Sequence, residues 1–254
     1  MRGKVVLLSV FLAFLGFGVG VMAFAAYKGL CRADFFQVTS IKINGNHHLT
    51  KAEVFELSGV DIRTNLLAMS VSQSEKKISS HPWVKNVSIT RELPNTINIT
   101  IKERTPAALV NLETGLHYID REGTVFASVQ ALEDIDLPVI TGLEGKDKKV
   151  ITENPLFDQA LLFLKYTEKG NYIFPKQNVS ELHIADMNQL ILYLVERPFP
   201  VYLGKGDLAV KYNRLVKVLY WLYKKEEFPQ VAYIRMDMFS DQVVVGMTPG
   251  GERT

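Results

Sequence analysis

Five histidines are the first candidates for a catalytic or metal site. They are His47, His48, His81, His117 and His183. None of them belongs to an HExxH motif or lies beside a pair of cysteines, the two spacings by which zinc is most often held. The chain has 1 cysteine, Cys31, so no CxxC motif occurs and no internal disulfide can form. We therefore expect no metal ion and no cofactor, and interpret His47 and His48 as solvated loop residues.

Other catalytic motifs are also missing from the sequence. No GxSxG, SxxK or P-loop motif is present. The turn at 204–207 contains two glycines, but it lacks P-loop spacing, and Asp207 would repel phosphate; we interpret it as a helix N-cap. Acidic pairs such as Asp120 and Glu122 fit loop charges better than the cleft carboxylates of a glycosidase. The sequence predicts that the protein is not an enzyme and has no small-molecule substrate.

Charge and aromatic residues bear on nucleic-acid binding. The 29 Lys and Arg are nearly balanced by 27 Asp and Glu, whereas a nucleic-acid binder needs a basic face. Tyr220, Trp221 and Tyr223 lie between Lys217 and Lys224, and such interleaving can bind single strands. We favour the alternative that these rings belong to a core with a basic edge, and expect no nucleic-acid partner.

The N-terminal segment predicts a membrane anchor. Residues 5–27 contain no charge, and a helix of this length would extend roughly 35 Å, which exceeds the bilayer core of about 30 Å. The run is longer than the ~7–15 apolar residues of a signal peptide, although 23–25 resembles a cleavage site. Arg2 and Lys4 precede the span, so we expect residues 1–4 in the cytoplasm and the bulk outside.

Residues 34–104 predict a small α+β domain. A strand lies near 38–43, and capping boxes at Thr50–Glu53 and Ser72–Glu75 begin two short helices. Two alternating strands follow, joined by the turn at 93–96, with Ile97, Ile99 and Ile101 on one face of the second. The predicted order is strand, helix, helix, strand, strand (βααββ), with the helices covering the apolar face of the sheet.

Residues 105–249 predict a mixed, β-rich domain with two helices. One helix follows Asn154 and a proline, and the other follows Asp207. We expect the core stripe of the second helix to contain Val210, Leu215, Val218, Leu219 and Leu222. Predicted strands lie at 107–112, 116–120, 123–126, 137–141, 179–186, 189–196, 200–204, 231–239 and 242–247.

Four stretches together resemble the FtsQ/DivIB family of bacterial cell division proteins. They are "FQVTSIKINGNHHLT", "HPWVKNVSITRELPNTINITIKERTPAAL", "YIDREGTVF" and "VYLGKGDLAVKYNRL". The resemblance implies a POTRA domain at 34–104 and an FtsQ-type β domain at 105–249. It also implies a single-pass protein of the cell inner membrane, located at the division septum, with most of the chain in the periplasm. Such proteins are non-catalytic scaffolds that bind FtsB and FtsL and help control septal peptidoglycan synthesis.

The same resemblance implies where partners bind. In the family a late strand accepts a partner strand at the sheet edge, and the matching segment here is 238–247. Lys211 matches a basic position that pairs with an acidic partner residue; a solvated helix charge is the alternative interpretation. The family's Asp-Leu-Arg-aromatic sequence is replaced by Asp-Met-Phe-Ser at 237–240, which lacks the arginine. The expected partner-binding residues are Lys211, Phe239, Ser240, Val243, Val245 and Met247.

Two rival functions were weighed. A POTRA-containing secretion or outer-membrane assembly component would continue into a β-barrel of alternating strands. About 150 residues follow Arg104, and the two predicted helices occupy much of that length. A membrane-anchored periplasmic enzyme would need a clustered acid, base or nucleophile, which the sequence does not display.

Overall fold

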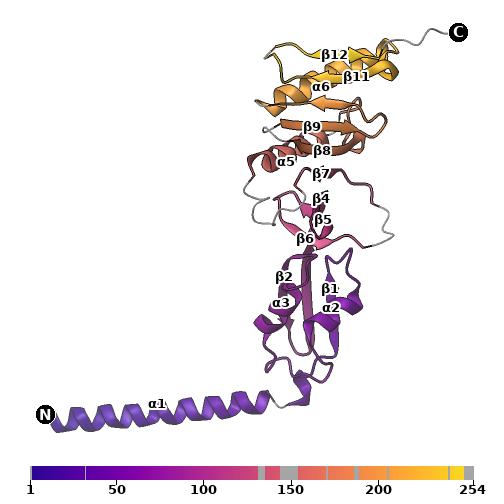
Figure 1. The fold of residues 1–254 in the computed structure, drawn as a ribbon. Helices are drawn as coiled ribbons and strands as arrows, with labels where there is room; N and C mark the ends of the chain where they lie inside the picture. Colours follow the sequence, from indigo (N-terminus) through magenta and orange to yellow (C-terminus); the bar gives the residue numbers. More distant parts are fainter. Residues whose placement is uncertain are drawn as a thin grey trace. The chain divides into compact units, whose positions relative to one another are not determined.

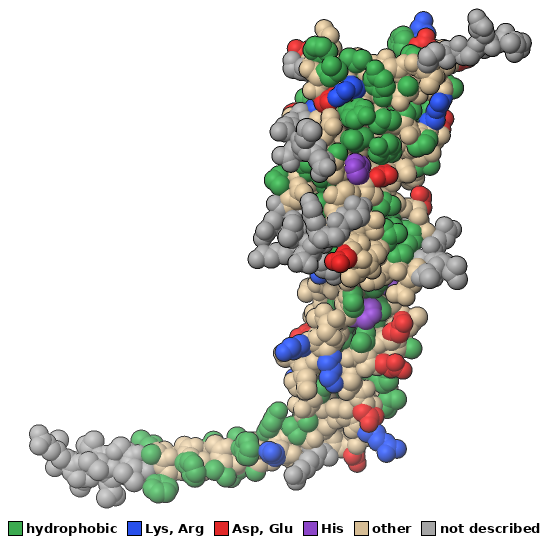
Figure 2. Space-filling model, in the orientation of Figure 1, with side chains coloured by type: hydrophobic (Ala, Val, Ile, Leu, Met, Phe, Trp, Pro, Cys, Tyr) green, Lys and Arg blue, Asp and Glu red, His purple; other side chains and the backbone are tan. Residues whose placement is uncertain are grey.

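A computed structural model describes residues 2–31, 33–130, 135–143, 154–169, 171–185, 189–204, 206–239 and 241–248. It divides into two compact units, Met1–Arg104 and Thr105–Thr254 (Figure 1). Helix α1 spans Arg2–Leu30. Its segment Phe11–Leu30 is long and apolar enough to cross a membrane and is not buried by the rest of the protein. Figure 2 shows the apolar side chains along this helix. The chain thus has the single N-terminal apolar helix that is typical of a single-pass membrane protein.

The first unit continues with a short 3-10 turn, Asp34–Phe36, and a three-stranded sheet flanked by two helices. Its sheet has the order β1-β3-β2, with β1 parallel to β3 and β2 antiparallel to it. This is the predicted βααββ order. The elements are β1 (Ser40–Asn44), α2 (Lys51–Ser58), α3 (Val71–Ser79), β2 (Val84–Glu92) and β3 (Thr96–Glu103).

Alternation along β3 positions the core of this unit. Ile97, Ile99 and Ile101 are buried in one cluster with residues of α2 and α3. The opposite face is polar, and there Lys42 pairs with Glu92 at 2.9 Å. One face of the sheet is therefore covered and the other solvated, as the period of two predicts.

One of the two predicted capping boxes is correct. Thr50 and Glu53 cap α2 reciprocally. Helix α3 instead begins after Ser70, whose hydroxyl accepts from the Gln73 amide at 3.4 Å. Ser72 lies inside the first turn, and Glu75 is used elsewhere, because its carboxylate accepts the backbone N–H of Ile89 on β2 at 2.9 Å.

The second unit is an α+β arrangement built on one large sheet. Its described residues form a nine-stranded sheet with the order β12-β11-β10-β9-β8-β7-β4-β5-β6. Helices α5 and α6 share the hydrophobic core with the sheet. The strands are β4 (Pro106–Leu112), β5 (Gly115–Asp120), β6 (Val125–Ser128), β7 (Val139–Thr141), β8 (Val179–Ala185), β9 (Gln189–Leu194), β10 (Pro200–Tyr202), β11 (Val231–Arg235) and β12 (Val244–Met247), and the helices are α5 (Pro155–Glu168) and α6 (Leu208–Lys224).

Both helices begin where the sequence predicts. The Asn154 side chain caps α5 by accepting from the Leu156 amide at 2.9 Å. Asp207 caps α6 by accepting from the amides of Ala209 at 2.8 Å and Val210 at 3.3 Å. The turn at 204–207 is therefore a helix start, although Lys205 lies outside the described residues.

The buried stripe of α6 differs from the predicted one at its N-terminal end. Leu215, Leu219 and Leu222 are buried and Val218 is half-buried, but Val210 is 42% exposed. Because the helix begins at Leu208, the face that meets the core passes through Leu208, Lys211 and Tyr212.

The aromatic residues near the end of α6 also differ from the prediction. Tyr220 and Trp221 are 53% and 49% exposed, so the expectation that they are core residues is wrong. Tyr223 is half-buried: its ring stacks on Phe228 at 4.5 Å, and its hydroxyl donates to Glu196 at 2.7 Å. Burial raises the pKa of the Tyr223 hydroxyl, and the hydrogen bond to Glu196 adds to this. One face of the helix therefore presents rings to solvent.

Candidate protein-binding edge

Strand β12 forms one edge of the large sheet. It pairs antiparallel with β11, with Ile234 opposite Val245 and Arg235 opposite Val244. Within the described part of the chain no other strand pairs with it. An edge strand offers unpaired backbone donors and acceptors, which a second chain can use to add a strand.

The alternation of backbone groups tells which residues of β12 face this open side. At its end the Thr248 amide donates inward to the Gln230 carbonyl at 2.7 Å. Successive residues of an antiparallel strand turn their N–H and C=O groups to opposite sides. Val244 and Gly246 therefore pair with β11, while the backbone groups of Val243, Val245 and Met247 face outward.

The side chains of these outward-facing residues form a mixed surface. Val243 and Val245 are half-buried and pack against the core that α5 and α6 share with the sheet. Met247 is exposed, as is Phe239 in the connection between β11 and β12. The predicted strand 238–247 is thus shorter than expected, since β12 begins at Val244. Ser240 lies outside the described residues.

A hollow of about 300 Å³ lies beside this connection, between it and the start of α6. Lys211 contributes to its wall and is only 8% exposed. Its ammonium group donates to the carbonyls of Leu203 and Met236, at the ends of β10 and β11. Burial lowers the pKa of Lys211, an effect that the negative charge of Asp237 opposes. The interpretation of Lys211 as a solvated helix charge is therefore wrong.

The remaining wall of the hollow is held by a polar network. Arg235 donates to Asp237 at 3.1 Å and 2.7 Å, and Gln189 donates to the same carboxylate at 2.8 Å. The hydrogen bond from Arg235 holds the pKa of Asp237 below its ordinary value against the effect of burial. The Arg235 guanidinium also lies 4.7 Å from the centre of the Tyr202 ring. This network fixes the path of the chain as it leaves β11.

Gly246 is a site residue that the sequence did not reveal. A Cβ atom built at Gly246 would lie 2.3 Å from the Tyr233 ring, so only glycine lets this ring lie flat over β12. The pair covers the face of the sheet opposite the helices near its edge. The signal that could have found it is a lone glycine inside a strand pattern, which often marks a close approach.

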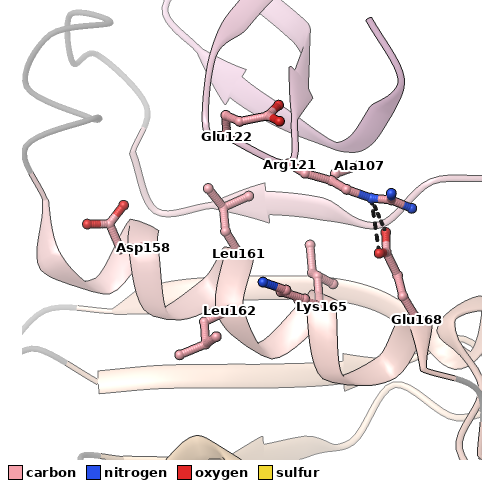
Figure 3. A pocket seen from close by; sticks show the side chains of 9 residues that line it. Ala107, Arg121, Glu122, Asp158, Leu161, Leu162, Lys165 and Glu168 are labelled. Atoms are coloured by element: carbon pink, nitrogen blue, oxygen red, sulfur yellow. Dashed lines mark hydrogen bonds and ion pairs between the residues drawn. The ribbon is translucent and has the colours of Figure 1, made fainter.

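The largest hollow of the second unit, about 510 Å³, lies between α5 and the turn after β5 (Figure 3). Its charged groups pair with one another: Arg121 reaches Glu168 at 3.1 Å, and Lys176 reaches the same carboxylate at 3.5 Å. The Asp120 carboxylate shapes the adjacent turn by accepting from the amides of Glu122 and Thr124. No group of three or more metal-ligating side chains occurs among the described residues. These groups hold the fold together and offer no nucleophile beside a base.

Comparisons with known proteins give a consistent result. Residues 36–104 match the model of the POTRA domain, FtsQ-type, and residues 108–237 match that of cell division protein FtsQ/DivIB, C-terminal. A cell division protein FtsQ of Syntrophotalea carbinolica is 32% identical over 209 residues, covering 82% of this chain and 73% of the relative. That of Geotalea daltonii is 29% identical over 233 residues, covering 89% and 82%. The cell division protein DivIB of Clostridium tetani is 25% identical over 221 residues, covering 85% and 82%.

Proposed function

Because the chain belongs to the FtsQ/DivIB family of cell division proteins, we propose that it is a single-pass scaffold of the bacterial division machinery. Residues 1–4 lie in the cytoplasm and 5–27 cross the inner membrane. Residues 34–104 form a POTRA domain, and 105–249 carry the partner-binding edge in the periplasm at the septum. The scaffold links FtsB- and FtsL-like proteins and helps control septal peptidoglycan synthesis without catalysing a reaction.

The open side of β12 is the observation that carries this proposal. Three alternate residues, Val243, Val245 and Met247, direct backbone groups away from β11. A partner segment in extended conformation can pair with them and lengthen the sheet by one strand. The exposed side chains of Phe239 and Met247 add apolar contacts, and Ser240 belongs to the same connection.

Lys211 contributes to partner binding from below this surface. Its ammonium joins the ends of β10 and β11 to α6, and it also brings a positive charge to the wall of the hollow. An acidic side chain of the partner that enters the hollow gains from that charge. The residue thus positions the edge and favours an anionic guest.

The rival function in secretion or outer-membrane assembly has less support. A POTRA domain alone would be compatible with both functions, but the match to the C-terminal model of FtsQ/DivIB extends over most of the second unit. A periplasmic enzyme is also disfavoured, because the charged groups around the largest hollow of that unit neutralise one another.

The test combines purification with depletion in the native cell. Affinity-tagged full-length protein, extracted from membranes in mild detergent, should co-purify with FtsB- and FtsL-like proteins, and depletion should give filamentous cells. Normal division after depletion would reject the scaffold. Hydrolysis of isolated peptidoglycan by the purified protein would reject its non-catalytic character.

A further inference from the structure

Three large apolar side chains outside α1 are exposed in the described part of the first unit. They are Phe35, Ile62 and Leu93, which are 69%, 62% and 62% exposed. Each lies in a different segment: the 3-10 turn after α1, the loop between α2 and α3, and the turn between β2 and β3. Exposed side chains scattered singly need no explanation, but a cluster does.

Backbone hydrogen bonds bring these three segments together. The loop between α2 and α3 is joined to the start of the domain twice, by the Val38 amide to the Thr64 carbonyl at 3.0 Å and by the Leu66 amide to the Phe36 carbonyl at 2.7 Å. The β2–β3 turn is joined to it by the Thr39 amide, which donates to the Asn95 carbonyl at 3.0 Å. All three apolar side chains therefore lie at the end of the domain where β1 begins.

This end is also the one that follows α1 directly. The side-chain amide of Asn65 donates to the carbonyls of Leu30 at 3.1 Å and Ala33 at 3.0 Å. Ala33 is only three residues beyond the end of the helix, so it lies within roughly 10 Å of that end, because each residue spans at most ~3.6 Å. The polar layer on each side of a bilayer is about 5–8 Å thick. The loop is thus held at headgroup depth by the chain itself.

We propose that Phe35, Ile62 and Leu93 form a lipid-contact surface that inserts at the boundary between headgroups and acyl chains. The inference rests on the membrane anchoring in the proposed function. Apolar insertion carries it, and charge contributes little, because Arg63 and Arg91 at this end are offset by Asp34 and Asp61. The surface continues the apolar surface of α1 and holds the POTRA domain against the membrane.

A fluorescence quenching experiment tests this surface in the full-length protein. In a Cys31→Ala background, single cysteines replace Ile62, Phe17 within the span, or His47. His47 is exposed beyond the far end of β1, a strand that rises about 3.3 Å per residue. Each carries an environment-sensitive fluorophore, and the protein is reconstituted in vesicles of phosphatidylethanolamine and phosphatidylglycerol with brominated acyl chains.

We expect quenching at Ile62→Cys to exceed that at His47→Cys roughly threefold or more, since interfacial side chains insert about 5–10 Å. Quenching at Phe17→Cys with none at Ile62→Cys would overturn the lipid contact and leave the anchoring intact. No quenching at Phe17→Cys would remove the anchoring and the inference together. Shielding at Ile62→Cys that rises with protein concentration, without quenching by lipid, would assign the surface to a second copy of the chain and overturn the proposal.

Asn65→Asp provides a matched second variant. It keeps the oxygen that accepts from the Leu67 amide at 2.9 Å and removes the donors to Leu30 and Ala33. Quenching at Ile62→Cys should then fall, with the melting of the domain unchanged. Undiminished quenching would show that Asn65 does not hold the loop at the membrane.

Discussion

Two sheet edges of this molecule differ in how they treat their backbone. Strand β2 is an edge of the POTRA sheet, but its Ile89 amide is occupied by the Glu75 carboxylate at 2.9 Å. Strand β12 is an edge of the large sheet, and within the described residues its outer side pairs with no other strand. A guarded edge resists uncontrolled association, whereas an open one is a template for pairing.

This difference shows that an open edge is not an unavoidable consequence of a sheet. The POTRA domain covers part of its long edge with a side chain from α3. The second unit instead invests its polar groups in fixing the chain beside β12: Lys211 and the Arg235–Asp237 pair hold the connection from β11, and their hydrogen bonds leave the outer backbone of β12 unused. We infer that the edge is kept in shape for a guest.

Proline substitutions in β12 give the largest expected effects. Val244→Pro removes an inward hydrogen bond to β11 and should destabilise the second unit by about 3 kcal/mol. Val245→Pro removes an outward N–H, so it should leave thermal unfolding nearly unchanged and abolish co-purification of the FtsB-like partner. Thermal unfolding and pull-down of both variants measure the two effects.

These adjacent variants control for one another, since both replace half-buried valines of one strand. Partner binding that survives Val245→Pro would show that the outer backbone of β12 is not the contact. Equal destabilisation by both substitutions would contradict the assigned alternation.

Replacing Lys211 has the next largest effect. Lys211→Met keeps the length of the side chain but leaves the carbonyls of Leu203 and Met236 without their donor, which should cost about 1–3 kcal/mol of stability. Partner affinity should fall as well, because the positive charge of the hollow is lost. Lys217→Met, on an exposed position of the same helix, is the matched control and should change neither quantity. A stability equal to that of the unmodified protein would deny the role of Lys211 in fixing β10 and β11.

The guard of β2 predicts a smaller effect. Glu75→Met removes the acceptor for the Ile89 amide and should cost about 1 kcal/mol, as a typical hydrogen bond does. It should also increase self-association, measured by light scattering near the melting temperature. Glu75→Gln keeps an acceptor oxygen and should behave like the unmodified protein. If Glu75→Met remains as monodisperse as Glu75→Gln, the guard has no protective role.

Acidification should have the smallest effect. Arg235 lowers the pKa of Asp237 in the folded state, so this ion pair stabilises the fold above the ordinary pKa of 3.8 and is lost as the pH falls through the lower folded-state value. The stability difference between the unmodified protein and Asp237→Asn should therefore be constant near neutrality and shrink below about pH 4. Chemical denaturation at several pH values measures it. A difference independent of pH would mean that Asp237 contributes through packing alone.

The sequence predicted those features that depend on neighbouring residues. The period of two at Ile97, Ile99 and Ile101 defined the POTRA sheet, and Asn154 and Asp207 located the starts of α5 and α6. Sequence patterns failed where distant contacts decide.

Glu75 fits a helix cap locally, but its carboxylate is used by an amide of β2, so Ser70 caps the helix. Lys211 has the pattern of a surface charge, but the ends of two strands that follow and precede α6 bury it. The contact of Tyr233 with Gly246 depends on the register of β11 against β12, which no local pattern specifies.

Residue-resolved amide hydrogen exchange of β12 tests the central claim most directly. In the protein alone, the amides of Val244 and Gly246 should be protected and those of Val245 and Met247 should exchange fast. Addition of the periplasmic segment of the FtsB-like partner should protect Val245 and Met247 at least tenfold, roughly the effect of one new hydrogen bond of ~1.4 kcal/mol. Tight binding of that segment with unchanged exchange at Val245 and Met247 would contradict strand addition at this edge.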